Sequence, residues 1–263
     1  MRRVVFNQKG GVGKTTLVCN LAAIGAAQGR RTLIVDLDPQ ANCSHYLLGQ
    51  AAESPGVTGF FEQQLSFRLS PQAPKQFVQT TAWNHLDLLT SDATLDDLES
   101  KLESRYKMFK LREALDELQP HYDDIWLDTP PKLGFFARTA LIAAERCLIP
   151  FDCDAFSRRA LYGLQSVLQE IRTDHNPQLR LEGVVVNQYQ PRARLPRQLV
   201  EELRSEGLPI LEPFLSASVR IRESHQQAQP LVQLCPQHKL TQQFQALYQR
   251  LQASDSVLAD HFT

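Results

Sequence analysis

A glycine-rich turn near the N-terminus constrains what this 263-residue chain can fold into. The apolar run 3–7 has the length of a buried strand, and it leads directly into Lys-Gly-Gly-Val-Gly-Lys-Thr-Thr at positions 9–16. A helix is predicted over 15–28, because apolar side chains recur there at helical spacing and a glycine follows. With the apolar run 32–36 as the next strand, this is a strand–helix–strand unit, which implies parallel strands and a right-handed crossover.

The chemistry of this turn predicts a nucleotide site. Glycines let the backbone curl so that successive N–H groups point at phosphate oxygens, and the following helix adds its positive N-terminus. The segment fits the G-x-x-x-x-G-K-[ST] pattern of P-loops, with Lys9 in place of the first glycine. Lys14 is expected to reach the β- and γ-phosphates of ATP, and the Thr15 hydroxyl to bind Mg²⁺. The predicted nucleotide-binding residues here are Gly10, Gly11, Val12, Gly13, Lys14, Thr15 and Thr16.

Further apolar runs predict that strands and helices continue to alternate along the chain. Residues 50–84 are interrupted by proline and glycine, so we expect an irregular stretch with one short helix. We predict a single α/β P-loop NTPase domain over 1–263, with a mostly parallel twisted sheet and helices on both faces, in three α/β/α layers. The length does not require a second domain. Strands are expected at 85–89, 124–128, 146–150, 181–187 and 209–211, and helices at 95–102, 110–118, 139–144, 160–171, 196–205 and 240–251.

Charge and cysteine content narrow the class of protein. The formal net charge is -1, so any nucleic-acid binding has to come from a local basic patch. The five cysteines are odd in number and no pair is spaced as C-x-x-C, so neither a disulfide framework nor a zinc site is expected. We see no signal peptide and no apolar run near the roughly 20 residues that cross a bilayer, which predicts a cytoplasmic protein.

Lys9 departs from the common P-loop pattern, and this departure says most about the type of P-loop protein. Lys9-Gly10-Gly11-Val12-Gly13-Lys14-Thr15-Thr16 resembles the deviant Walker A motif, K-G-G-x-G-K-T-[ST], of the ParA/MinD family of ATPases. In that family the first lysine reaches across a nucleotide-sandwich dimer to the partner's phosphates. The resemblance therefore implies that this chain forms a homodimer when it binds ATP, with Lys9 and Lys14 both acting on the phosphates.

Acidic residues at two predicted strand ends extend the resemblance. Segment 36–42, Asp-Leu-Asp-Pro-Gln-Ala-Asn, resembles the family's D-x-D-P-Q-x-N segment, and 125–131, Ile-Trp-Leu-Asp-Thr-Pro-Pro, resembles its Walker B and switch II segment. The resemblance implies that Asp38 is the hydrolytic residue and that Asp36 and Asp128 help to hold Mg²⁺. A turn or helix-cap role remains an alternative for Asp36 and, less strongly, for Asp38.

A polar residue after the strand predicted at 181–187 completes the nucleotide site by resemblance. Asn187 lies where the family's adenine-contacting asparagine often lies, and its amide offers both a donor and an acceptor to a base edge. A capping role is almost as good an interpretation of Asn187.

Two arginine-rich segments, 190–197 and 218–223, are candidates for binding DNA. Both resemble, in order and context, the segments that carry DNA-contacting arginines in ParA proteins, and phosphate contacts need only positive charge held in register. The alternative is an ordinary solvated basic face. Glu223-Ser224-His225 stands where partition members often have E-A-P. The predicted DNA contacts are Arg192 and Arg220, with Arg194, Arg197 and Arg222 as neighbours and Arg158 and Arg159 as further candidates.

These features favour a ParA-type, Soj-like partition ATPase. The resemblance implies weak ATP hydrolysis, an ATP-bound dimer on nonspecific DNA of the nucleoid, and a ParB-like or cargo-adaptor partner that stimulates hydrolysis. The cargo would be a plasmid, a chromosome or a protein assembly. One alternative is a MinD-like membrane ATPase, but the polar face of helix 240–251 is glutamine-rich and no membrane binding is expected. The other alternative is a P-loop metabolic ligase or kinase.

Overall fold

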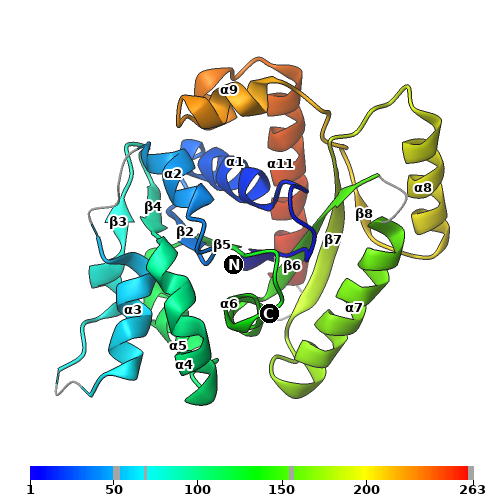
Figure 1. The fold of residues 1–263 in the computed structure, drawn as a ribbon. Helices are drawn as coiled ribbons and strands as arrows, with labels where there is room; N and C mark the ends of the chain where they lie inside the picture. The colour runs from blue at the N-terminus through cyan, green and yellow to red at the C-terminus, as the bar shows by residue number, and fades with distance from the viewer. Residues whose placement is uncertain (50–53, 68–69, 154–156, 260–263) are drawn as a thin grey trace.

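The computed structural model describes residues 1–49, 54–67, 70–153 and 157–259. Within them, the strands form one sheet in the order β3-β4-β2-β5-β1-β6-β7-β8 (Figure 1). Every neighbouring pair is parallel except β3 with β4, which is antiparallel. The strands are β1 (Arg2–Val5), β2 (Thr32–Asp36), β3 (Gln79–Thr80), β4 (Leu86–Leu89), β5 (Asp124–Asp128), β6 (Arg146–Asp152), β7 (Arg180–Asn187) and β8 (Ile210–Leu211).

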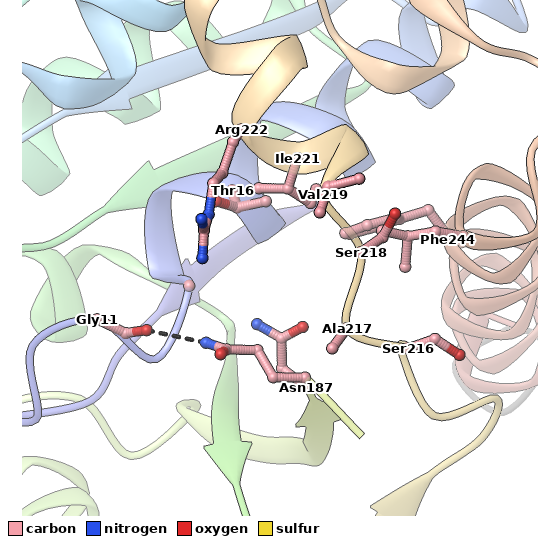
Figure 2. Close-up of a pocket in the computed structure, with 13 residues that line it drawn as sticks. Gly11, Thr16, Asn187, Ser216, Ala217, Ser218, Val219, Ile221, Arg222 and Phe244 are labelled. Atoms are coloured by element: carbon pink, nitrogen blue, oxygen red, sulfur yellow. Dashed lines mark hydrogen bonds between the residues drawn. The ribbon is translucent and has the colours of Figure 1, made fainter. Parts of the chain in front are cut away.

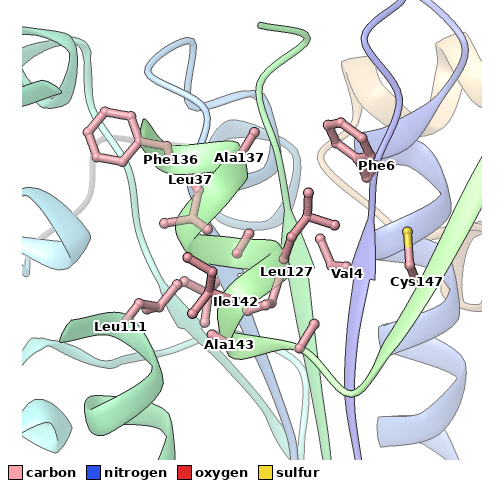
Figure 3. Packing of buried hydrophobic residues seen from close by; sticks show 14 of the residues in the cluster. Val4, Phe6, Leu37, Leu111, Leu127, Phe136, Ala137, Ile142, Ala143 and Cys147 are labelled. Atoms are coloured by element: carbon pink, nitrogen blue, oxygen red, sulfur yellow. The ribbon is translucent and has the colours of Figure 1, made fainter. Parts of the chain in front are cut away.

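Both faces of the sheet are buried, which is why its strands are apolar at consecutive positions. Val5 and Trp126 face a layer formed by α1 (Lys14–Ala27), α2 (Asn42–Leu48), α10 (Leu231–Leu234) and α11 (Lys239–Ala259). Their neighbours Val4 and Leu127 face the opposite layer and belong to the apolar cluster that Figure 3 shows, together with Phe136, Ala137 and Ile142. That layer holds α3 (Gly56–Leu65), α4 (Glu99–Ser104), α5 (Lys110–Leu118), α6 (Phe135–Ala143), α7 (Ser157–Asp174) and α8 (Arg194–Ser205).

The predicted α/β fold with a mostly parallel sheet and helices on both faces is confirmed. The parallel strands bring their carboxyl ends to one edge, where open sheets of this kind bind ligands. In the register of the central strands, Asp128 lies beside both Val5 of β1 and Asp36 of β2. The loops after β1, β2, β5 and β7 therefore meet at this edge.

Several short elements were not predicted. Helix α2 begins after Ala41, which has a φ of 52°, and no side chain caps its start, so the sequence carries no start signal there. Helix α9 (Arg220–Gln226) has only seven residues, too few for a clear apolar period. Helix α6 begins at Phe135, four residues before the predicted start at 139. Part of the stretch 50–84, described except for 50–53 and 68–69, forms α3, a short 3₁₀ helix at Pro74–Phe77 and β3.

Candidate functional site

The loop between β1 and α1 has the backbone shape that its glycines predict. Gly11 and Gly13 have φ values of 77° and 91°, in the left-handed region that glycine adopts without strain. Gly13 is also sterically required, because an added Cβ would lie 2.3 Å from the Asn187 amide nitrogen. The same amide donates a hydrogen bond of 2.9 Å to the Val12 carbonyl oxygen. The end of β7 therefore supports the glycine loop directly.

Lys14, the first residue of α1, is held across this loop. Its side chain is nearly buried, and Nζ donates to the backbone carbonyl oxygen of Lys9 at 3.2 Å. Burial lowers the pKa of Lys14, whereas the nearby carboxylates of Asp128 and Asp38 raise it. The ammonium group is therefore held against the glycine loop, where the lysine of a P-loop contacts phosphates.

Thr15 and Asp128 form a pair that fits a hydrated magnesium ion. The Thr15 hydroxyl donates to Asp128 Oδ2 at 2.7 Å. The other carboxylate oxygen, Oδ1, is buried and has no hydrogen-bond partner among the described residues. Burial, followed by the charge of Asp36, raises the pKa of Asp128 well above its usual range. A half-buried hydroxyl and a buried carboxylate with an unused oxygen supply the hard oxygen ligands that Mg²⁺ prefers, directly or through water.

Asp36 is tied to the loop that follows β2. Its Oδ1 accepts from the Asp38 N–H at 3.2 Å, and its Oδ2 accepts from the Ser44 N–H at 2.9 Å and the Ser44 hydroxyl at 2.7 Å. Burial raises the pKa of Asp36 to about 6, and the Ser44 hydrogen bonds oppose that shift. In this arrangement the carboxylate positions the turn that carries Asp38, which gives weight to the turn role foreseen as an alternative.

Asp38 lies in that turn at the edge of the nucleotide site. Its side chain is 7% exposed, and Oδ1 accepts from the Gln40 N–H at 3.0 Å. The turn closes with a hydrogen bond of 2.8 Å from the Ala41 N–H to the Asp38 carbonyl oxygen. One of its carboxylate oxygens is therefore engaged in holding the turn.

Lys9, at the start of the loop, is held by contacts with β6. Its Nζ forms an ion pair of 2.6 Å with Asp152 at the end of β6, and the Lys9 side chain is 35% exposed. The Lys9 N–H donates to Asn7 Oδ1 at 2.9 Å, and the Asn7 amide donates to the Pro150 carbonyl oxygen at 2.8 Å. The backbone of Lys9 is thus fixed, while its ammonium reaches the surface.

A cavity of 460 Å³ adjoins the glycine loop, as Figure 2 shows. Gln188, in the left-handed region at φ 54°, donates to the Gly11 carbonyl oxygen at 3.1 Å, which is the dashed line in the figure. The predicted nucleotide residues Gly11, Gly13, Thr16 and Asn187 line this cavity together with residues 216–219, Ile221, Arg222, Leu240 and Phe244. Its apolar wall suits a flat base, next to a loop shaped for phosphates.

Helix α9 covers this site and was missed by the sequence prediction. His225 Nε2 lies 3.1 Å from the Thr16 hydroxyl oxygen, and the His225 ring stacks on Tyr46 with ring centroids 4.1 Å apart. The Tyr46 and Ser224 hydroxyls share a short hydrogen bond. The one available signal was the sequence Glu-Ser-His at 223–225, because it differs from the E-A-P of partition proteins.

The predicted DNA-contacting arginines separate into two groups. Arg192, Arg194 and Arg197 line a hollow of 660 Å³ with Tyr189 and Phe214, whose rings lie 4.8 Å apart. Arg192 also lines a second hollow of 470 Å³ that is bordered by residues 216–218. The structure therefore brings the segment around 190–197 together as one basic surface.

The remaining arginines lie elsewhere. Arg220 forms an ion pair of 2.6 Å with Glu223 on its own helix, and Arg222 lines the nucleotide cavity. Arg158 pairs with Glu202 at 2.8 Å and with Glu206, which joins α7 to α8. The side chain of Arg159 lies outside the described part of the chain.

The apolar face of the C-terminal helix α11 packs against the core. The residues of this face are buried against α1 and the sheet, and they are Phe244, Leu247, Tyr248 and Leu251. Among the described residues, no helix combines the length and apolar character that crossing a bilayer requires.

Comparison with known proteins gives the family. Residues 3–181 match the family model described as an AAA domain. A chromosome partitioning protein ParA from Myxococcus xanthus is 32% identical over 254 residues, which cover 96% of this chain and 88% of that protein. A chromosome-partitioning ATPase Soj from Thermus thermophilus is 34% identical over 238 residues, covering 90% and 89% of the two chains.

A solved structure shares the fold. The cobyrinic acid a,c-diamide synthase of Mycobacterium smegmatis with bound ADP and magnesium superposes with a TM-score of 0.81. It is 25% identical and covers 95% of this chain and 93% of that one. The fold is thus shared with a metabolic enzyme, whereas the higher identities over nearly the full length are to partition proteins. This chain belongs to the ParA/Soj family of P-loop ATPases.

Proposed function

We propose that this protein is an ATP-driven partition ATPase whose ATP-bound homodimer holds nonspecific DNA. The single ATPase domain would bind ATP at the glycine loop, with Thr15 and Asp128 holding Mg²⁺, which neutralises phosphate charge. Hydrolysis with Asp38 as the water-orienting residue would end the dimer. A ParB-like or cargo-adaptor partner would stimulate hydrolysis and so set the time for which plasmid, chromosome or protein cargo is held on the nucleoid.

The observation that carries the proposal is that one segment of the chain lines both the nucleotide cavity and the hollow beside the basic surface. Residues 216–218 line the nucleotide cavity, and they also line the hollow that contains Arg192. The same segment is tied to β7 by a bridge between Tyr189 and Ser216. A nucleotide that shifts this segment would therefore move the basic surface as well. This contact between sites supports DNA binding that depends on the bound nucleotide.

ATP-dependent DNA binding is the first expected result. With ATP the protein should bind arbitrary duplex DNA, and with ADP it should bind at least about tenfold more weakly. The double variant Arg192→Ala/Arg220→Ala should lose ATP-dependent binding, and the slope of log affinity against log salt should shrink by about 2 per subunit. Fluorescence anisotropy with a labelled duplex at several salt concentrations measures both quantities.

A matched control separates a DNA surface from a loss of net charge. Arg172→Ala/Arg180→Ala removes two exposed arginines, one from the end of α7 and one from the amino end of β7, far from the ligand edge. This control should bind DNA as the wild type does. Pelleting with anionic liposomes in ATP, without any DNA binding, would instead favour the membrane ATPase and would reject this proposal.

The Lys9–Asp152 ion pair gives a second expected result. Lys9→Ala should keep ATP binding but fail to dimerise, because Lys9 is the group proposed to reach the partner's phosphates. Asp152→Asn removes the competing carboxylate, and a half-exposed pair contributes up to about 1 kcal/mol, so the ATP dimer should tighten about threefold to fivefold. Sedimentation with a slowly hydrolysed ATP analogue measures dimerisation. A normal dimer in Lys9→Ala would remove the argument for a shared site.

A further inference from the structure

Arg222 is placed in the nucleotide cavity and not on the basic surface. It lines the cavity together with Gly11, Gly13 and Thr16. Figure 2 shows its side chain reaching from α9 alongside Thr16 toward the glycine loop. Within the described part of the chain, its guanidinium makes no hydrogen bond or ion pair. A cation in such a place has a full set of donors available to a ligand.

The helix that carries Arg222 is fastened to the phosphate loop's own helix. His225, one turn further along α9, contacts the Thr16 hydroxyl and stacks on Tyr46. Tyr46 in turn binds both Ser224 and the Asn20 amide, the latter at 3.1 Å. The position of α9 is therefore fixed by hydrogen bonds and ring stacking with residues of α1 and α2. These contacts hold Arg222 at the nucleotide site.

The charges around the phosphate site call for a second cation. The carboxylates of Asp128 and Asp38 lie near the ammonium of Lys14, and the carboxylate of Asp36 lies near both of them. Lys9, the other cation of the loop, is engaged by Asp152 in the single chain. A nucleotide adds further negative charge through its phosphates. A guanidinium suits this need, because its planar array of donors matches phosphate oxygens in two-point hydrogen bonds.

We propose that Arg222 binds the phosphates of the nucleotide held by its own subunit. This proposal rests on the proposed function only in assuming that the cavity binds an adenine nucleotide. It also means that Arg222 is not one of the DNA contacts predicted from the sequence. Arg220, two residues earlier, pairs with Glu223 and is absent from the cavity wall, so α9 divides its arginines between two tasks. Arg222 supplies the affinity that a single chain needs before any second subunit contributes Lys9.

The test compares nucleotides with and without phosphates, in the absence of DNA. Arg222→Gln should weaken ADP and ATP binding about tenfold or more, the loss expected for one charge-assisted phosphate contact, and should leave adenosine binding unchanged. Arg222→Lys should recover part of the affinity, because it keeps the charge but not the two-point geometry. Isothermal titration with Mg²⁺ present measures all three ligands.

A control on another face excludes a general effect of charge. Arg172→Gln removes an exposed arginine from α7, on the opposite face of the sheet from α9's cluster, and should bind ADP as the wild type does. Circular dichroism of each variant confirms folding. Wild-type ADP affinity in Arg222→Gln would overturn the proposal, as would an equal loss for adenosine and ADP.

These outcomes are independent of the DNA experiment. If the wild type binds ADP but never DNA, the partition function fails, and the Arg222 comparison still stands. If Arg222→Gln binds ADP normally but loses DNA binding, Arg222 is a DNA contact, the partition function survives and this inference fails.

Discussion

Asp38→Ala is expected to lower ATP turnover by about 100-fold while leaving ATP binding intact, because the variant loses the group proposed to orient the attacking water. Asp38 is suited to this role by its place in a turn fixed by Asp36 and by its near-complete burial at the edge of the site. ATP dimers of this variant should therefore be long-lived on DNA. Phosphate release and the dissociation rate from labelled DNA measure the two effects.

Two further variants show which part of the site each residue serves. Asp38→Asn can still accept the Gln40 hydrogen bond that holds the turn, so it should match Asp38→Ala in turnover and the wild type in stability. Lys14→Ala should lose measurable ADP and ATP binding, because the buried ammonium is the loop's own phosphate-binding cation. Equal turnover in wild type and Asp38→Ala would falsify the role assigned to Asp38.

Glu182→Gln is expected to lower the free energy of unfolding by about 3 kcal/mol, because it removes the main counter-charge of a buried arginine. Arg3 is fully buried in β1, binds Glu182 in β7 through Nε at 2.9 Å and Nη2 at 3.0 Å, and lies 3.7 Å from Asp124. Asp124 is shared with Arg30 at 2.7 Å, so it cannot replace Glu182. The melting temperature should fall by about 6–12 °C.

An exposed ion pair gives the matched comparison. Glu201→Gln removes a carboxylate that lies 3.4 Å from Arg204 and is 73% exposed, so it should change the free energy of unfolding by less than about 0.5 kcal/mol. Urea denaturation of both variants measures the difference. If the two variants had the same free energy of unfolding, the buried Arg3–Glu182 pair would contribute no more to stability than the exposed pair.

The phosphate loop and its carboxylates were predictable because their geometry is local. A strand, a glycine turn and a helix follow one another directly, and parallel pairing then brings Asp36 and Asp128 to the same edge without further information. The turn role of Asp36 was harder to foresee, because it depends on Ser44, eight residues away on a helix without a start signal.

The contacts that could not be predicted join residues far apart in the chain. Thr16 and His225 are 209 residues apart, and Lys9 and Asp152 are 143 apart, so neither pair leaves a pattern in any local window. Arginine-rich segments look alike in sequence whether they face a nucleotide, an acid or solvent. The packing of α9 on α1 and α2 places Arg222 in the cavity wall and leaves Arg220 outside it, paired with Glu223. The ion pair of Arg158 is seen only once α8 is in place, because α8 carries Glu202.

The wall formed by residues 216–218 would also couple the affinities of the two proposed ligands, because it borders both hollows. When two ligands bias the same segment, each must change the affinity of the other by the same factor. Binding to the nucleoid would then raise the affinity for ATP by the same factor by which ATP raises the affinity for DNA. At a given ATP concentration, a larger fraction of the DNA-bound molecules than of the freely diffusing ones would therefore hold ATP.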